Sequence, residues 1–214
     1  MKKSIVLVAL LSLMTLGNKV SAQSISGAGA TFPQPFYNAA FVTYERLAHA
    51  KVTYGGIGSG GGIRSLKDKI VDFGASDAFL SNAELKEMPA AVVHIPTCSG
   101  AVVVAYNLPG VKQIKLTPTV LAQIFLGQIK NWNHPALRKL NPGVRFPNKE
   151  ITVVHRSDGS GTTNMFTDYL TKVNAVWKSK VGAGKTVNWP VGIGAKGNPG
   201  VAGTIHPTVG SIGY

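Results

Sequence analysis

The sequence predicts an α/β protein built on a mostly parallel β-sheet. Short runs of apolar and β-branched residues alternate along the chain with segments in which apolar residues recur every three or four positions. Strands that alternate with helices in this way favour parallel pairing. A hydrophobic content of 44% with 14% charged residues is typical of a globular protein, and 214 residues suffice for one large domain or two small lobes.

Each expected element rests on a local pattern. Apolar, β-branched runs predict strands at residues 51–54, 71–76, 91–95, 101–106 and 151–155. Apolar side chains at the helical period predict helices around residues 36–47, 63–70, 120–125 and 165–173. Ser81 and Glu84 match a capping box, which predicts one more helix start.

The chain is expected to divide near residue 100, because the run at residues 99–107 is long enough to pass from one lobe to another. The expected parts are a leader at residues 1–22, a first lobe at residues 23–100 and a second lobe at residues 101–214.

A glycine-rich stretch follows at residues 182–203 and contains Gly184-Lys185-Thr186, which is similar to the end of a nucleotide-binding P-loop. Ser179 stands where that motif needs its first glycine, so we expect a surface loop instead.

The leader has the features of a secretory signal peptide. Lys2 and Lys3 precede an apolar run at residues 5–16, and small residues before and at Ala22 suit cleavage. The apolar run is too short for a membrane span. We therefore expect an exported protein that begins after Ala22.

The charge of the exported chain is strongly positive. Without Lys2, Lys3 and Lys19, 19 basic side chains stand against nine acidic ones, a net charge of +10. Such a balance fits an anionic ligand, an anionic surface, nucleic acid or simply a solvated lysine surface. The lysines are scattered and no nucleic-acid-binding signature is present, so nucleic acid is not an expected partner.

Cys98 is the single cysteine, which excludes an intramolecular disulfide and a zinc framework. We expect it to pack as a small hydrophobic residue.

Three stretches share one design, in which glycines and hydroxyl residues come directly before a predicted helix. They lie at residues 27–32, 58–62 and 158–162. The first N–H groups of a helix have no partner within the helix, and the helix dipole adds partial positive charge there. Glycine allows a ligand to approach the backbone closely. A turn of this kind often only caps a helix, but three of them in one α/β chain favour a shared anion site at the carboxyl ends of the strands.

Two charged residues narrow the kind of anion. Arg156 follows a predicted strand, and its planar guanidinium can hold an oxyanion through two parallel hydrogen bonds. Asp77 also follows a predicted strand, and an ionised carboxylate can only accept a hydrogen bond. Phosphate carries a proton at neutral pH and sulfate does not, so Asp77 would select phosphate. The alternative for Asp77 is a helix N-cap or a surface ion pair.

Five stretches taken together resemble the periplasmic phosphate-binding proteins of Pst-type ABC transporters. They are GAGATFPQPFY, YGGIGSGGG, VDFGASDAFLS, FLGQIKNW and RSDGSGTTNMFTDYL, in this order. The resemblance runs from about Ser24 to Tyr214. It implies a type II periplasmic-binding fold of two α/β lobes with the ligand between them. It also implies a monomer that works in the periplasm without a cofactor and delivers inorganic phosphate to a membrane permease.

The resemblance also implies roles for single residues. The phosphate-binding positions would be Thr31, Phe32 through its backbone N–H, Ser59, Asp77, Arg156, Ser160, Gly161 and Thr162. Asp158 would form an ion pair with Arg156 and partly compensate its positive charge. Family members continue past residues 210–214, and the continuation completes the first lobe. We therefore expect the first lobe to be incomplete here and to expose apolar surface.

Two other functions are open at this point. One is a fragment that keeps the motifs but does not bind phosphate. The other is a secreted phosphoryl or acyl hydrolase with Ser59 or Ser160 as nucleophile and His155 as base. The hydrolase lacks a Gly-x-Ser-x-Gly elbow, and His155 alternates with Arg156 along a predicted strand, so their side chains would point to opposite faces.

Overall fold

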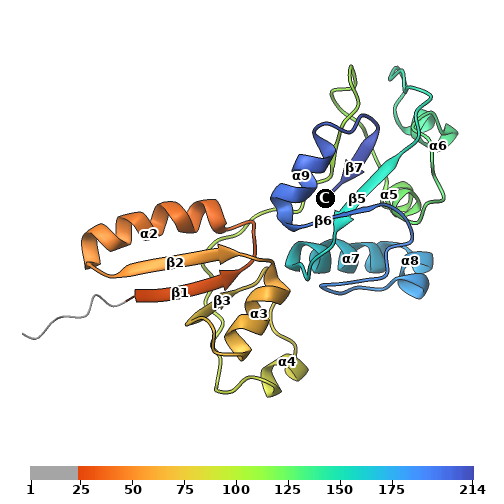
Figure 1. Cartoon of the computed structure of the whole chain (residues 1–214). Coiled ribbons are helices and arrows are strands. Elements are labelled where there is room, and N and C mark those ends of the chain that lie inside the picture. Colours follow the sequence, from red (N-terminus) through yellow and green to blue (C-terminus); the bar gives the residue numbers. More distant parts are fainter. Residues whose placement is uncertain (1–23) are drawn as a thin grey trace, which may run out of the picture.

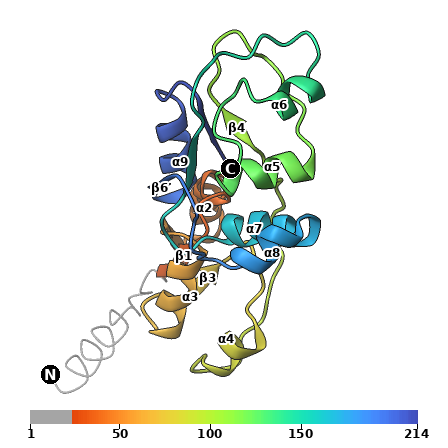
Figure 2. The ribbon, with the colours of Figure 1, turned by 90° about the vertical axis from the view of Figure 1, so that its right-hand side faces the viewer.

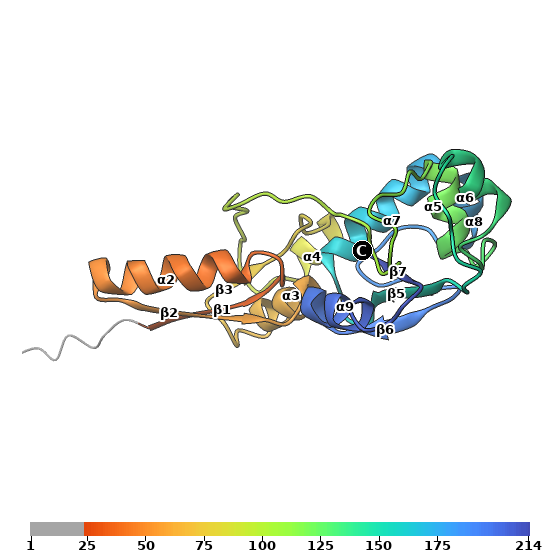
Figure 3. The ribbon, with the colours of Figure 1, turned by 90° about the horizontal axis from the view of Figure 1, so that it is seen from above.

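The computed structural model describes residues 24–214, which form two α/β regions side by side (Figure 1). The first region (residues 24–104) contains β1 (Ser24–Gly29), α2 (Gln34–Ala48), β2 (Lys51–Gly56), α3 (Ser59–Lys67), β3 (Phe73–Ala75) and α4 (Asn82–Lys86). Seen from above, the molecule is elongated, with α2 at one end (Figure 3). The predicted signal peptide lies outside the described residues.

The second region (residues 105–214) contains the remaining elements. They are β4 (Ala105–Tyr106), α5 (Pro118–Phe125), α6 (Pro135–Leu140), β5 (Thr152–Arg156), α7 (Gly161–Val173), α8 (Ala175–Lys180), β6 (Ile193–Ala195), α9 (Gly197–Ile205) and β7 (Ser211–Gly213). Within residues 24–214, no helix has the length and apolar character needed to cross a membrane.

Each region has a sheet of its own. The first sheet has the order β2-β1-β3 and is wholly parallel. The second has the order β4-β7-β5-β6, and only the β4–β7 pair is antiparallel. The predicted α/β fold with mostly parallel sheets is therefore confirmed.

Helices cover both faces of the second sheet, as Figure 2 shows, with α9 on one side and α5, α7 and α8 on the other. Neighbouring residues of a strand point to opposite faces. Val153 accordingly joins the main core with side chains of α5, α7 and α8, whereas Val154 packs on Val201 and Ile205 of α9. The central strands β5 and β7 are thus buried from both sides, which holds their carboxyl ends in place.

The predicted helices are confirmed, and their starts have local causes. Ser81 accepts a hydrogen bond from the Glu84 N–H at 3.2 Å, and the Glu84 carboxylate accepts one from the Ser81 N–H at 2.8 Å, so the predicted capping box is present. Thr117 caps α5 ahead of Pro118, and Ser160 caps α7.

Four predictions were wrong in whole or in part. Residues 91–95 and 101–104 form no strand, because a strand needs a neighbour to accept its hydrogen bonds and no described strand lies beside them; Val93 and Ile95 are exposed. Residues 182–203 are not simply a surface loop, because β6 pairs with β5 and α9 packs on the sheet. Cys98 is exposed and does not pack in a core.

Candidate functional site

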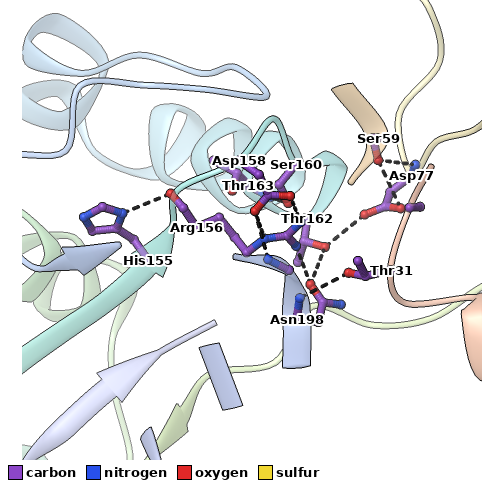
Figure 4. Close-up of polar contacts among 12 residues, drawn as sticks. Thr31, Ser59, Asp77, His155, Arg156, Asp158, Ser160, Thr162, Thr163 and Asn198 are labelled. Atoms are coloured by element: carbon purple, nitrogen blue, oxygen red, sulfur yellow. Dashed lines mark hydrogen bonds and ion pairs between the residues drawn. The ribbon is translucent and has the colours of Figure 1, made fainter. Parts of the chain in front are cut away.

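The candidate site lies where five parallel strands end. The chain passes from the carboxyl ends of these strands directly into the residues of interest (Figure 4), which are Thr31 after β1, Ser59 after β2, Asp77 after β3, residues 156–162 at the end of β5 and Asn198 after β6. Open parallel sheets hold their ligands at this edge. The site therefore takes residues from both regions.

Arg156 is the charged centre of the second region's part of the site. Its side chain is buried, and its Nε and Nη2 donate to the two carboxylate oxygens of Asp158 at 2.7 and 2.5 Å. Its Nη1 donates to the Asn198 Oδ1 at 2.5 Å. These three bonds leave two of the five guanidinium N–H donors without a partner among residues 24–214. The expected pair of Asp158 with Arg156 is present, and the guanidinium is held ready to donate to a further acceptor.

Asp77 brings a carboxylate from the first region to the same place. Its Oδ2 accepts a hydrogen bond from the Thr162 hydroxyl at 2.9 Å, and its backbone N–H donates to the Ser59 Oγ at 3.3 Å. Burial raises the pKa of the Asp77 carboxyl, against the opposing effects of Thr162, Arg156 and Ser59. Within the described part of the chain, Asp77 neither caps a helix nor forms an ion pair, so the alternative offered for it is wrong.

The two regions approach each other closely around Gly161. A Cβ at this position would lie 2.6 Å from both the Asp77 Cβ and the Ser59 Oγ. The Gly60 N–H also donates to the Gly159 carbonyl at 2.9 Å across the same boundary. Glycine is needed at residue 161 because any side chain would push the first region away.

Hydroxyl groups line the remainder of the site. Ser160 is buried and accepts a hydrogen bond from the Thr163 N–H at 3.1 Å, as expected of the N-cap of α7. The Thr31 Oγ1 accepts a hydrogen bond from the Asn198 N–H at 3.1 Å. Phe32, Asp77 and Thr162 all line one cavity of about 850 Å³ that runs into the first region. Among the predicted site residues, hydrogen bonds join Ser59 to Asp77, Asp77 to Thr162 and Arg156 to Asp158. Within residues 24–214, the other predicted residues form no hydrogen bond to another member of the predicted set; these are Thr31, Phe32, Ser160 and Gly161.

Asn198 is a site residue that the sequence did not reveal. It bonds to Arg156 and Thr31, and its Oδ1 lies 3.5 Å from the Thr162 hydroxyl oxygen. It belongs to the start of α9, inside the stretch that was expected to be a surface loop. Pro199 in the first turn after a glycine was the available signal, because proline is favoured where a helix begins.

His155 lies apart from the hydroxyl groups. Its ring stacks on Trp189, with ring centres 4.8 Å apart, and its Nδ1 lies 3.0 Å from the Arg156 carbonyl oxygen. Burial lowers the pKa of His155. A nucleophilic serine needs a base within hydrogen-bond reach, and in residues 24–214 His155 makes no contact with Ser59 or Ser160. This geometry does not favour the hydrolase alternative.

A family model described as a PBP superfamily domain matches residues 17–214 of the sequence. The chain belongs to this superfamily.

Two sequence relatives of this PBP superfamily member are named phosphate-binding protein PstS. The protein of Pasteurella multocida is 47% identical over all of this chain, and that of Haemophilus influenzae is 48% identical over 94% of it. The chain spans 61% of the length of each of these relatives.

Solved structures share the fold of this superfamily member. A phosphate-binding protein from Stenotrophomonas maltophilia matches with a TM-score of 0.63 and 21% identity, over 90% of this chain and 60% of its own. The periplasmic phosphate-binding protein PfluDING, solved with bound phosphate, matches with a TM-score of 0.68 and 24% identity, over 90% of this chain and 56% of its own.

Proposed function

We propose that this chain binds inorganic phosphate between its two regions and delivers it to the membrane permease of an ABC-type phosphate importer. It uses no cofactor and catalyses no reaction. The observation that carries the proposal is the meeting of Arg156 and Asp77 in one site. Arg156 compensates the charge of an oxyanion, and a single carboxylate on the other side accepts a proton that the anion must bring.

The proposed contacts follow from the donors that the site contains. The remaining guanidinium N–H groups of Arg156 bind phosphate oxygens, and the hydroxyls of Ser59, Ser160 and Thr162 donate to others. Gly161 leaves room for the anion at the start of α7, where the helix dipole favours negative charge.

Thr31 and Phe32 bind from the first loop, Phe32 through its backbone N–H. Asp158 keeps the Arg156 charge partly compensated, so that phosphate can leave again.

Asp77 is the proposed basis of the choice between phosphate and sulfate. Because burial raises its pKa, its carboxylate shares a proton readily with a hydrogen phosphate ion. Sulfate would place one hydrogen-bond acceptor against another. Leaving a buried acceptor without a donor costs about 1–3 kcal/mol, a factor of roughly ten to a hundred in affinity.

The proposal includes the surroundings of the protein. The names of the relatives support a role in phosphate transport. We place the chain in the periplasm as a monomer, with residues 1–22 as its signal peptide, residues 23–100 and 101–214 as its two lobes, and no nucleic-acid partner.

Calorimetric titration with phosphate and with sulfate tests the proposal. The unaltered protein should bind phosphate and give no response to sulfate. Asp77→Asn should weaken phosphate binding and narrow the preference over sulfate by roughly ten- to a hundredfold. Asp68→Asn, which removes the same charge from an exposed position at the end of α3, should change neither affinity. Equal affinity of the unaltered protein for the two anions would refute the role of Asp77.

One observation favours a second candidate, a protein that keeps the motifs without binding phosphate. Most of the large apolar side chains that are exposed lie in the first region, among them Val42, Leu47 and Phe79. A ligand that binds only the folded state must raise its stability. A cooperative thermal transition that phosphate moves to higher temperature would therefore exclude this candidate.

A further inference from the structure

The glycine-rich segment at residues 182–187 has a place in the structure that the proposed phosphate contacts do not explain. The Gly184 N–H donates to the Thr167 Oγ1 at 3.1 Å, and Thr167 is fully buried in α7. One residue later, the Lys185 carbonyl accepts a hydrogen bond from the Ser160 N–H at 2.8 Å. The backbone of residues 184–185 is thus hydrogen-bonded both to the N-cap of α7, at Ser160, and to the middle of that helix, at Thr167.

The side chain of Lys185 reaches the other region. Its Nζ lies 2.7 and 3.0 Å from the two carboxylate oxygens of Glu84 in α4. Glu84 is itself held by the capping box with Ser81. Both charged side chains are largely buried, with 18% of Lys185 and 31% of Glu84 exposed. Burial raises the pKa of Glu84, but Lys185 and Ser81 lower it by more, so the carboxylate stays ionised at neutral pH.

This ion pair differs from the others in what it connects. Four ion pairs are present in residues 24–214. Lys67–Glu87 lies within the first region, and Arg156–Asp158 and Lys172–Asp168 lie within the second. Glu84–Lys185 alone among them joins the two regions, beside the site and not within it.

We propose that Lys185 is a positioning residue for phosphate binding and that its ion pair with Glu84 is a latch between the two regions. The inference rests on the proposed function for its ligand. Because the carbonyl of Lys185 holds the N-cap of α7, the attraction of Glu84 draws the helix start toward Ser59 and Asp77. Breaking the pair lets the regions separate and weakens binding without removing any phosphate contact.

The direction in which Glu84→Gln changes the phosphate affinity distinguishes a latch from a purely electrostatic effect. Lys185→Met weakens phosphate binding in either case, because a positive charge near an anion also attracts it. Glu84→Gln removes a negative charge, so electrostatics alone would tighten binding. A latch predicts the opposite, a loss of about three- to tenfold by calorimetry. Lys67→Met, which breaks an ion pair of the same length inside the first region, should leave the affinity unchanged.

Two further variants complete the binding test. Lys185→Arg keeps a positive charge opposite Glu84 and leaves the capping box of Glu84 with Ser81 intact, so it should keep the affinity to within about twofold. Salt screens a partly exposed pair, so the affinity of the unaltered protein should fall more steeply with added sodium chloride than that of Glu84→Gln/Lys185→Met. Tighter binding by Glu84→Gln, or a loss in Lys185→Arg as large as that in Lys185→Met, overturns the latch.

A measurement without phosphate keeps the latch testable if the proposed function fails. Val42 in α2 and Val176 in α8 are exposed, and cysteines at these positions accept spin labels once Cys98, which is also exposed, is replaced by alanine. Lys185→Met should lengthen or broaden the distance distribution between the labels, and Lys67→Met should not. An unchanged distribution in Lys185→Met overturns the latch, whereas a change in a protein that never binds phosphate refutes only the proposed function.

Discussion

The two regions of this chain use the same kinds of elements but bury them differently. Of the 23 buried hydrophobic residues in residues 24–214, three lie in the first region and 20 in the second, where they form one main core with a small second cluster under α9. Of the 16 large hydrophobic residues that are exposed in this described part of the chain, 11 lie in the first region. The second region therefore has a closed core of its own, and the first region holds its residues with much less burial.

The charges are divided in the same way. Residues 24–104 carry six basic and six acidic side chains, whereas residues 105–214 carry 13 basic and three acidic ones. The net charge of +10 on residues 24–214 thus belongs wholly to the region that contains Arg156. A field of this sign attracts anions toward the well-packed region first. The well-packed, basic region thus supplies the Arg156 guanidinium, and the less buried region, whose net charge is zero, supplies the Asp77 carboxylate.

The largest expected effect compares the same substitution in the two cores. Leu170 in α7 is fully buried, and Leu47 in α2 is 72% exposed. Leu170→Ala should lower the free energy of unfolding by about 2–5 kcal/mol, because it leaves a cavity in a packed core. Leu47→Ala should change it by less than about 0.5 kcal/mol. Urea denaturation measures both, and equal losses would show that the first region is packed as tightly as the second.

A smaller effect is expected where the regions meet. Gly161→Ala places a methyl group against Asp77 and Ser59, which should weaken phosphate binding about tenfold or more, since overpacking costs about 1–3 kcal/mol. Gly203→Ala in α9 makes the same change where no atom lies within 4 Å of the new methyl group. It should bind phosphate normally. Calorimetric titration of both variants tests whether contact between the regions is needed, and unimpaired binding by Gly161→Ala would contradict it.

The smallest expected effect concerns the two carboxylates of the site, one from each region. Burial raises the pKa of Asp158, but Arg156 and the Gly197 N–H lower it by more, so its pKa lies below the usual range, whereas the pKa of Asp77 is raised by burial. The stability from Asp158 is present above about pH 4 and is lost as the pH falls through its folded pKa. The stability from Asp77 is present below about pH 4 and is lost as the pH rises through its folded pKa.

Measuring the free energy of unfolding as the pH is lowered distinguishes the opposite pH dependences of the Asp158 and Asp77 contributions. Asp158→Asn should flatten the loss of stability below about pH 4. Asp77→Asn should act above about pH 4, where it removes the gain in stability that accompanies protonation of the folded-state Asp77 carboxyl. Solvent screens both groups in part, so each change should be about 1 kcal/mol or less. Changes of the same sign in the two site variants would refute the opposite pKa shifts.

Local patterns were sufficient for much of the fold and for most of the site. A helix start depends on residues within a few positions of one another. The capping box at Ser81 and the glycine and hydroxyl residues before α3 and α7 therefore predict where these helices begin. The β1 strand was not predicted because its sequence, SISGAG, has little strand propensity. It exists because β2 and β3 pair with it on both sides. Residues 91–95 show the reverse, a strand-like sequence without a neighbouring strand.

The sequence by itself determined which turns carry the donors and acceptors around Ser59, Asp77 and Arg156, because a helix start and its preceding strand end are set by adjacent residues. Only the tertiary structure decided that Asn198 and Lys185 join them. Asn198 reaches Arg156 because β6 pairs with β5, and Lys185 reaches Glu84 across 101 positions of the chain. Contacts of this separation depend on how the two regions pack, and no local pattern contains that information.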